Sequence, residues 1–287
     1  MRFSYQTITW GGVVGDPVGV TSIKDLFYRA NGSSATAIRE VGAAGYDGVE
    51  MFDGNLREFE GRPRELRSLL DEAGLELVAT YTGGNFIYPD ILADELWRVE
   101  QAARLASGLG ARHLVVGGGA QRAGGTTDDD YDRLAAALDR VVVIARDHGL
   151  KASYHPHLTT IVEGPEQIDR VLGLSDIYLC PDTAHLTAGG ADPVTIIRRY
   201  ADRVVYAHLK DFRAEPFAFL PLGEGDVDFP AILGVLRDAG FDGWLTVELD
   251  AYDGPPGEAA SRSRAYLADL IVDPGASTAS AADPRSA

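Results

Sequence analysis

Two near copies of one motif, AAGYDGVE (residues 43–50) and DAGFDGWLTVE (residues 238–248), decide the fold of this chain. Each begins at the end of a segment with helical periodicity and passes through a glycine that is typical of helix C-termini. Each then enters a short apolar run that is typical of a buried strand. We interpret the copies as two occurrences of a recurring strand–helix unit, and not as a solenoid repeat.

Apolar runs rich in β-branched and aromatic residues recur along the chain and predict strands. Their nearly continuous apolar character is typical of strands that are buried on both faces. The eight predicted strands span residues 3–10, 48–52, 75–82, 112–118, 151–157, 176–185, 203–211 and 243–250.

Segments with helical periodicity separate these strands, at residues 33–46, 63–75, 94–111, 130–150, 165–174, 192–201 and 228–241. This alternation predicts an α/β protein, a single-domain (β/α)8 TIM barrel over residues 1–272. A doubly wound sheet is the alternative, but no GxGxxG motif follows the first strand. The small polar tail, residues 273–287, is predicted to be disordered.

The composition limits the classes of partner. The net charge of −17, from 43 acidic and 26 basic residues, argues against a nucleic-acid surface. A single cysteine, Cys180, fits a reducing compartment, and neither a signal peptide nor an apolar run long enough to span a membrane is evident. We therefore expect a cytoplasmic protein that acts on a small molecule and binds neither nucleic acid nor membrane. The sequence leaves the oligomeric state open, a homo-oligomer included.

Polar residues gather where the last four predicted strands end, which is where TIM barrels carry their catalytic groups. Asp182, His208 and Glu248 come from three successive strands and offer carboxylate, imidazole and carboxylate ligands, while His155 offers a fourth from the neighbouring strand. This mixed set predicts one divalent ion, Mn²⁺ first, with Co²⁺, Mg²⁺, Fe²⁺ and Zn²⁺ as alternatives. The competing interpretation is that single residues of this kind cap helices or form hydrogen bonds.

The chain resembles a known family at the same strand ends. DTAH (182–185), VVYAHLKD (204–211) and WLTVELD (244–250) are similar to motifs of the xylose isomerase-like TIM-barrel superfamily of sugar isomerases and epimerases. YHPHLTTIVEGPEQIDRVL (154–172) and PLGEGDVDFPAIL (221–233) resemble its inosose dehydratase-like members in particular. The resemblance runs from about Met1 to Val272.

The resemblance implies roles for individual residues. Asp182, His208 and Glu248 match metal ligands of the family, Glu248 being also an acid/base group, and His185 matches a histidine that contacts substrate. The sugar epimerases of the family carry a glutamate where this chain has His155. That departure puts a symmetric two-glutamate epimerase mechanism in doubt, and it is shared by the inosose dehydratase-like branch.

The residues also leave the proton-transferring group open. An imidazole that already binds a metal cannot move a proton through the same nitrogen. Glu163, His185 and Lys210 are therefore the candidate bases, although Glu163 could instead cap the following helix. His157 is expected to support His155 or to contact substrate.

Two further residues have equally open roles. Glu50 is a candidate contact for substrate hydroxyls, or else the partner of an arginine such as Arg39. Trp10 is a candidate wall of the substrate pocket, or else part of the core.

These residues predict abstraction of a proton next to a ketone, with a divalent ion to polarise the carbonyl. The favoured outcome is a dehydratase or lyase reaction on an inosose or a 3-keto-glycoside; a ketose 3-epimerase or aldose–ketose isomerase is the alternative. An abasic-site endonuclease would need more ligands and a basic groove. A non-catalytic sugar-binding barrel would be expected to have lost its metal ligands by substitution.

Overall fold

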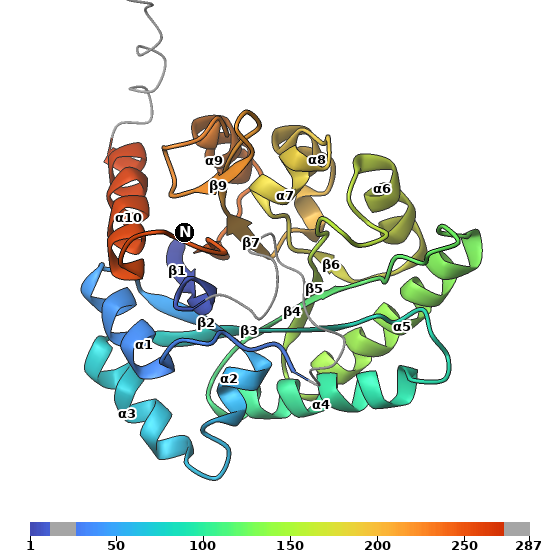
Figure 1. Cartoon of the computed structure of the whole chain (residues 1–287), viewed down its shortest axis with the longest axis horizontal. Helices are drawn as coiled ribbons and strands as arrows, with labels where there is room; N and C mark the ends of the chain where they lie inside the picture. Colours follow the sequence, from blue (N-terminus) through green and yellow to red (C-terminus); the bar gives the residue numbers. More distant parts are fainter. Residues whose placement is uncertain (12–26, 273–287) are drawn as a thin grey trace, which may run out of the picture.

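The computed structural model describes residues 1–11 and 27–272 and confirms the predicted barrel (Figure 1). Eight parallel strands form one sheet in the order β6-β5-β4-β3-β2-β1-β10-β7. These strands are β1 (Arg2–Gln6), β2 (Gly48–Phe52), β3 (Glu76–Gly84), β4 (His113–Gly118), β5 (Lys151–Tyr154), β6 (Tyr178–Leu179), β7 (Tyr206–Leu209) and β10 (Trp244–Val247).

The barrel closes between β6 and β7. Two isolated parallel bridges, Leu179 with Val204 and Asp182 with His208, join the first and last strands of the sheet. The backbone N–H of His208 donates to the Pro181 carbonyl at 2.9 Å. The described residues thus form a single barrel domain, closed by a seam of two isolated bridges.

Helices surround the sheet (Figure 1). They are α1 (Ser34–Ala43), α2 (Asp53–Arg57), α3 (Pro63–Ala73), α4 (Leu92–Gly108), α5 (Asp128–Asp147), α6 (Pro165–Leu174), α7 (Thr183–Ala188), α8 (Pro193–Arg199), α9 (Phe229–Asp238) and α10 (Pro256–Val272), with short 3-10 turns at Thr7–Thr9 and Ala201–Arg203. All seven predicted helices are present. The glycines expected after four of them, Gly45, Gly74, Gly149 and Gly240, adopt positive φ.

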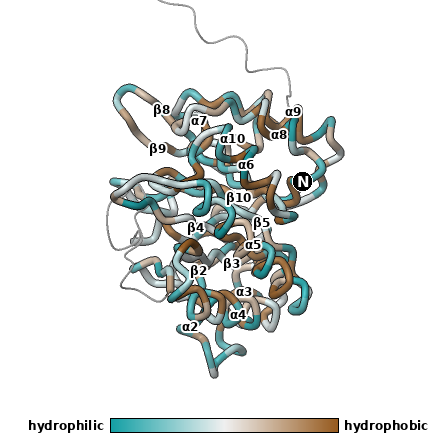
Figure 2. Tube along the Cα trace, turned by 90° about the vertical axis from the view of Figure 1, so that its right-hand side faces the viewer, coloured by the Kyte–Doolittle hydropathy of each residue, from teal (hydrophilic) through white to brown (hydrophobic). Residues whose placement is uncertain are grey.

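Four parts of the fold were not predicted. They are the helices α2, α7 and α10 and a small antiparallel hairpin, β8 (Asp211–Arg213) with β9 (Ala218–Leu220), which follows β7. Figure 2 shows this hairpin at one edge of the molecule, beside α7. The predicted strand over residues 176–185 is wrong in its second half, because Asp182 caps α7, which begins at Thr183.

Apolar side chains of the strands and helices form the core between the barrel and its helical layer. The barrel interior also holds polar side chains, among them Ser4, Glu50, His208 and Thr246, and each of these four is fully buried. Buried polar groups need partners or a ligand, so this interior requires an explanation other than packing. No helix in the described part of the chain is long and apolar enough to cross a membrane. The predicted disordered tail, residues 273–287, lies outside the described residues.

Candidate metal centre and active site

The structure brings together the four residues predicted to bind a metal. His155 directly follows β5, Asp182 follows β6, His208 lies in β7 and Glu248 directly follows β10. Each offers one ligand atom, and these atoms lie within 4.8 Å of one another. All four side chains are buried, so the cluster is enclosed by the barrel mouth.

The atoms that face one another in this cluster make no hydrogen bonds. Both ring nitrogens of His155, Nδ1 of His208 and Oε2 of Glu248 are buried without a hydrogen-bond partner. Nδ1 of His208 lies 2.5 Å from Oε2 of Glu248, in an ion-pair contact. Leaving such atoms unpaired costs about 1–3 kcal/mol each, and more for a charged group. A divalent cation is the partner that satisfies two imidazoles and two carboxylates at once, so the residues present fit the predicted group.

The two carboxylate oxygens of Asp182 have different roles, one in capping a helix and one in the cluster. Oδ1 accepts hydrogen bonds from the backbone N–H groups of Ala184 (2.9 Å) and His185 (2.8 Å), and so caps α7. Oδ2 makes no hydrogen bond and belongs to the cluster. Helix capping and ligation are therefore compatible, and the cap fixes the direction in which Oδ2 points.

Glu50, a candidate contact for substrate hydroxyls or else the partner of an arginine, contacts His208 and Tyr206. It is fully buried in the middle of β2. Its Oε2 accepts a hydrogen bond from the Tyr206 hydroxyl at 2.7 Å and faces Nε2 of His208 at 3.0 Å. Because a carboxylate only accepts, Nε2 of His208 carries a hydrogen toward Glu50, and Nδ1 is the ring nitrogen that faces the cluster.

Charges around His208 and Glu248 favour their ionised forms. Although burial alone would lower the pKa of His208, the Glu50 and Glu248 carboxylates raise it to about 10. Although burial alone would raise the pKa of Glu248, Lys210 and His208 hold it well below its usual range. Glu248 is therefore ionised near neutral pH, as a metal ligand must be.

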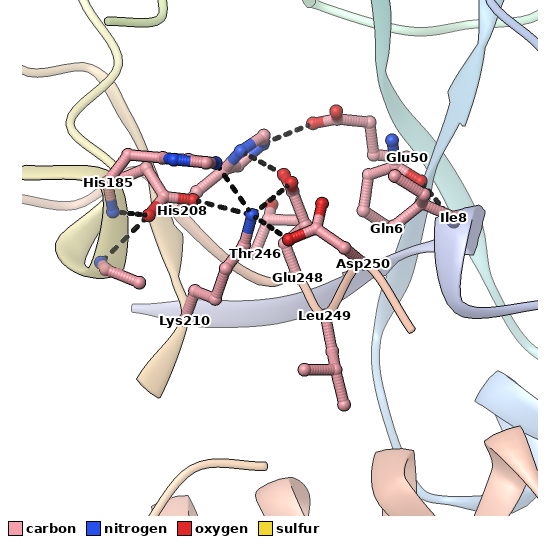
Figure 3. A network of polar contacts seen from close by, with 12 residues as sticks. Gln6, Ile8, Glu50, His185, His208, Lys210, Thr246, Glu248, Leu249 and Asp250 are labelled. Carbon is pink, nitrogen blue, oxygen red and sulfur yellow. Dashed lines mark hydrogen bonds and ion pairs between the residues drawn. The ribbon is translucent and has the colours of Figure 1, made fainter. Parts of the chain in front are cut away.

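Lys210 is the hub of the polar network in Figure 3. Its fully buried ammonium donates to Glu248 Oε1 at 2.7 Å, to Asp250 Oδ2 at 3.1 Å and to His185 Nε2 at 3.1 Å. Asp182 Oδ2 lies 3.4 Å from the same nitrogen. Although burial alone would lower the pKa of Lys210, the three carboxylates raise it above its usual value. All three ammonium hydrogens are engaged, so Lys210 has no lone pair with which to act as the predicted base.

His157 and His185 form a stacked pair beside the cluster, with ring centroids 3.7 Å apart. Nδ1 of His157 lies 2.6 Å from the Leu158 carbonyl, to which it must donate, so Nε2 keeps a lone pair. His185 has the opposite tautomer, because Nε2 accepts from Lys210 and leaves the hydrogen on Nδ1. Burial lowers the pKa of both rings, with Lys210 adding to the effect at His157 and His157 adding to it at His185. Both imidazoles are therefore neutral near pH 7.

Two other predicted site residues lie elsewhere. Trp10 is buried in the core, where it packs edge-on against Tyr5 and donates from Nε1 to Glu40 at 2.6 Å, in agreement with the core alternative. Glu163 accepts a short hydrogen bond from the Thr159 backbone N–H and one from Gln121 at 3.3 Å. It ties its own loop together and neither joins the cluster nor caps α6, because the cap of α6 is Gly164.

One wall of the site, formed by the β8–β9 hairpin, was not predicted from the sequence. Phe219 on β9 lies 5.2 Å from His185 between ring centroids, and its ring lies 5.1 Å from the Lys210 ammonium. Aromatic residues at 217 and 219 were a signal that could have been noticed, since side chains two apart share one face of a strand. The β8–β9 hairpin thus lays an aromatic ring over the His185–Lys210 side of the centre.

Comparisons with known proteins agree with this fold and place it in a family. Residues 38–270 match the family model described as xylose isomerase-like TIM barrel. The chain is 31% identical over 272 residues to inosose dehydratase of Geobacillus kaustophilus (strain HTA426), covering 82% of this chain and 86% of that protein.

Solved structures share the fold at low sequence identity. The IolI protein with a bound zinc atom superposes with a TM-score of 0.73 at 17% identity, covering 94% of this chain and 98% of that one. An L-ribulose 3-epimerase superposes with a TM-score of 0.71 at 19% identity, covering 94% of each chain. At these identities the superpositions bear on the fold alone.

Proposed function

The chain belongs to the xylose isomerase-like TIM barrel family, and on that premise we propose that it is a divalent-metal-dependent lyase acting on a polyhydroxylated ring ketone. The substrate class is an inosose or a 3-keto-glycoside, from which water or an alcohol is expelled. The inosose dehydratase that is 31% identical over most of both chains supports the lyase assignment. More coarsely, the chain is a sugar-processing enzyme of the lyase or isomerase/epimerase type.

One observation carries the metal dependence: four buried ligand atoms from four strand ends converge within 4.8 Å and leave one another without hydrogen bonds. His155, Asp182, His208 and Glu248 would hold the ion, with Mn²⁺ or Zn²⁺ suited to two nitrogens and two oxygens. When bound, such an ion supplies Lewis acidity toward a ketone oxygen. Elemental analysis of the purified protein identifies the ion.

The chain's own residues supply the proton chemistry. His157 is the group best placed to accept a proton, because its Nε2 lone pair is free and its Nδ1–H is held by the Leu158 carbonyl. His185 is a hydrogen-bond donor through Nδ1, since Lys210 occupies its Nε2. This assignment replaces Glu163 and Lys210 as bases, and it gives the two stacked histidines opposite roles.

The ligand set favours elimination over epimerisation. A symmetric epimerase needs two acid/base carboxylates on opposite sides of the sugar, and His155 stands where the second glutamate would be. Phe219 adds an apolar surface on the His185 side, which suits the C–H face of a ring substrate. A ketose 3-epimerase or aldose–ketose isomerase remains the alternative, because Glu248 is retained.

A turnover assay in D₂O separates these reactions. The metal-loaded protein is incubated with an inosose and with a 3-keto-glucoside, beside a sample treated with EDTA and the Asp182→Ala variant. Loss of water or aglycone, with a new ultraviolet absorbance from an enone or dione, is expected only with metal. A new stereoisomer that carries deuterium at unchanged connectivity would establish the epimerase instead. If the protein shows no turnover and no deuterium exchange with any polyol ketone, both the lyase and the epimerase hypotheses are ruled out.

A further inference from the structure

The Glu248 carboxylate divides its two oxygens between two cation positions. Oε2 lies 2.5 Å from His208 Nδ1, in the four-residue cluster described above, and Oε1 accepts from Lys210 at 2.7 Å. In Figure 3 the contacts of Glu248 run in these two directions. A carboxylate that serves two neighbouring positions is the usual bridge of a two-metal centre.

The second position has a ligand set of its own. His185, Glu248 and Asp250 each offer an atom, these atoms lie within 4.8 Å of one another, and all three side chains are buried. Oδ1 of Asp250 is in addition buried without a hydrogen-bond partner. One imidazole and two carboxylates are a complete set of protein ligands for Zn²⁺ or Mn²⁺.

The nitrogen of Lys210 lies inside this set, at 2.7 Å from Glu248, 3.1 Å from Asp250 and 3.1 Å from His185. We propose that the Lys210 ammonium is the built-in second cation of the centre, that it holds the place of a second metal ion, and that it limits the chain to one metal. The inference rests on the metal centre proposed above.

Charge and size both agree with this role. The Lys210 ammonium and one divalent ion together match the charges of the three carboxylates around them, Asp182, Glu248 and Asp250. Ammonium contacts near 3 Å are longer than zinc–ligand distances of about 2.0–2.2 Å, so the three ligands would move inward by somewhat under 1 Å around a metal. Because its cation is covalently attached, the second position is occupied at any metal concentration.

The inference is tested by metal stoichiometry, which does not depend on knowing the substrate. Wild-type protein, Lys210→Met and Lys210→Gln are dialysed against excess Mn²⁺, and bound metal is measured by elemental analysis and electron paramagnetic resonance. Methionine has similar length without charge, while glutamine keeps amide hydrogens for Glu248 and Asp250 should the first variant not fold. Circular dichroism confirms the fold of each variant.

We expect one Mn²⁺ per wild-type chain and two per chain in the uncharged variants, with a spin-coupled signal because Glu248 would offer one oxygen to each ion. The double variant Lys210→Met/Asp250→Asn is the matched control, and it should return to one Mn²⁺ because the second site loses a ligand. One Mn²⁺ in every folded Lys210 variant overturns the inference and leaves the metal centre standing. No Mn²⁺ or Zn²⁺ in the wild-type protein overturns the metal centre and the inference with it.

Discussion

Asp182 and His208 face each other across the seam that closes the barrel, paired by a parallel bridge and by the hydrogen bond from His208 N–H to the Pro181 carbonyl at 2.9 Å. One residue ends the sixth strand of the barrel and the other lies in the seventh. The same two side chains offer ligand atoms to one cluster. A bound ion would therefore join the two edges of the sheet where they pair only through isolated bridges.

This position predicts that metal stabilises the fold as well as serving the reaction. At a metal concentration 100 times its dissociation constant, binding adds about 2.7 kcal/mol to the free energy of unfolding. For a chain of this size that corresponds to a rise in Tm of about 5 °C. Scanning calorimetry with Mn²⁺ and with EDTA measures this rise in Tm. Asp182→Ala and His208→Ala should lose both the bound metal and the shift, while His148→Ala should keep both; a full shift in either ligand variant contradicts the assignment.

Replacement of His155 tests the fourth ligand position. Both of its ring nitrogens are buried and unpaired, so His155→Ala removes a ligand and leaves a cavity. We expect metal affinity to fall by at least tenfold in His155→Ala and by less in His155→Glu, because a glutamate occupies this position in the epimerases of the family. Competition with a fluorescent chelator gives the affinities. Equal losses in the two variants would place His155 outside the metal centre.

The sequence was sufficient for the barrel and for the ligand cluster, because both follow from local patterns. Buried parallel strands are continuous apolar runs, and their carboxyl ends share one face of a TIM barrel, so His155, Asp182, His208 and Glu248 could be grouped without coordinates. The role of Glu50 could not be predicted in this way. It depends on contacts with Tyr206 and His208, more than 150 residues away along the chain.

Trp10 and Glu163 show the other limit of sequence reasoning. Trp10 follows β1 and Glu163 lies in the loop between β5 and α6, and sequence position does not tell whether such a side chain points into the barrel mouth or back into its own loop. The Trp10 indole turns to Glu40, and the Glu163 carboxylate turns to the Thr159 N–H. The β8–β9 hairpin was missed because each of its strands has only three residues, too few for a period to be recognised.

Glu50 is expected to position His208. Replacing Glu50 with Gln keeps the size but allows the amide to donate, so Nε2 of His208 is no longer required to carry the hydrogen. Loss of such a supporting carboxylate typically costs 10–100-fold in metal affinity. Tyr206→Phe removes a neighbouring contact without changing the partner of His208, and should cost only a fewfold. Nitrogen-15 NMR of the histidine rings reports the tautomer directly; an unchanged His208 tautomer and unchanged affinity in Glu50→Gln would contradict this role.

His113 is expected to make the fold sensitive to acid. It is buried at the start of β4, its ring centroid lies 4.9 Å from that of Tyr206, and its Nδ1 has no partner. Burial, with Lys151 and Arg2 nearby, lowers its pKa to about 4. Between pH 6.5 and 4 the unfolded chain therefore binds more protons at this site than the folded chain, and the free energy of unfolding falls as pH falls.

The expected loss from this residue between pH 7 and pH 4.5 is about 2–3 kcal/mol. Urea unfolding of wild type and His113→Phe at the two pH values measures it, and the variant should lose less stability by that amount. His148→Gln removes a histidine at the end of α5 and is the matched control. Its free energy of unfolding should fall between the two pH values by as much as that of the wild type. Parallel pH dependence in wild type and His113→Phe would show that His113 charges freely in the folded state.

The stacked histidines give the last prediction, since their tautomers assign them opposite roles. His157 presents a lone pair on Nε2, whereas His185 presents a hydrogen on Nδ1. If His157 accepts the substrate proton, His157→Gln should lower kcat by about 10²–10⁴-fold and abolish solvent deuterium exchange, with metal content unchanged. His185→Gln removes a donor to bound substrate and should act mainly on KM. Deuterium exchange at the wild-type rate in His157→Gln, together with its loss in His185→Gln, would reverse the two roles.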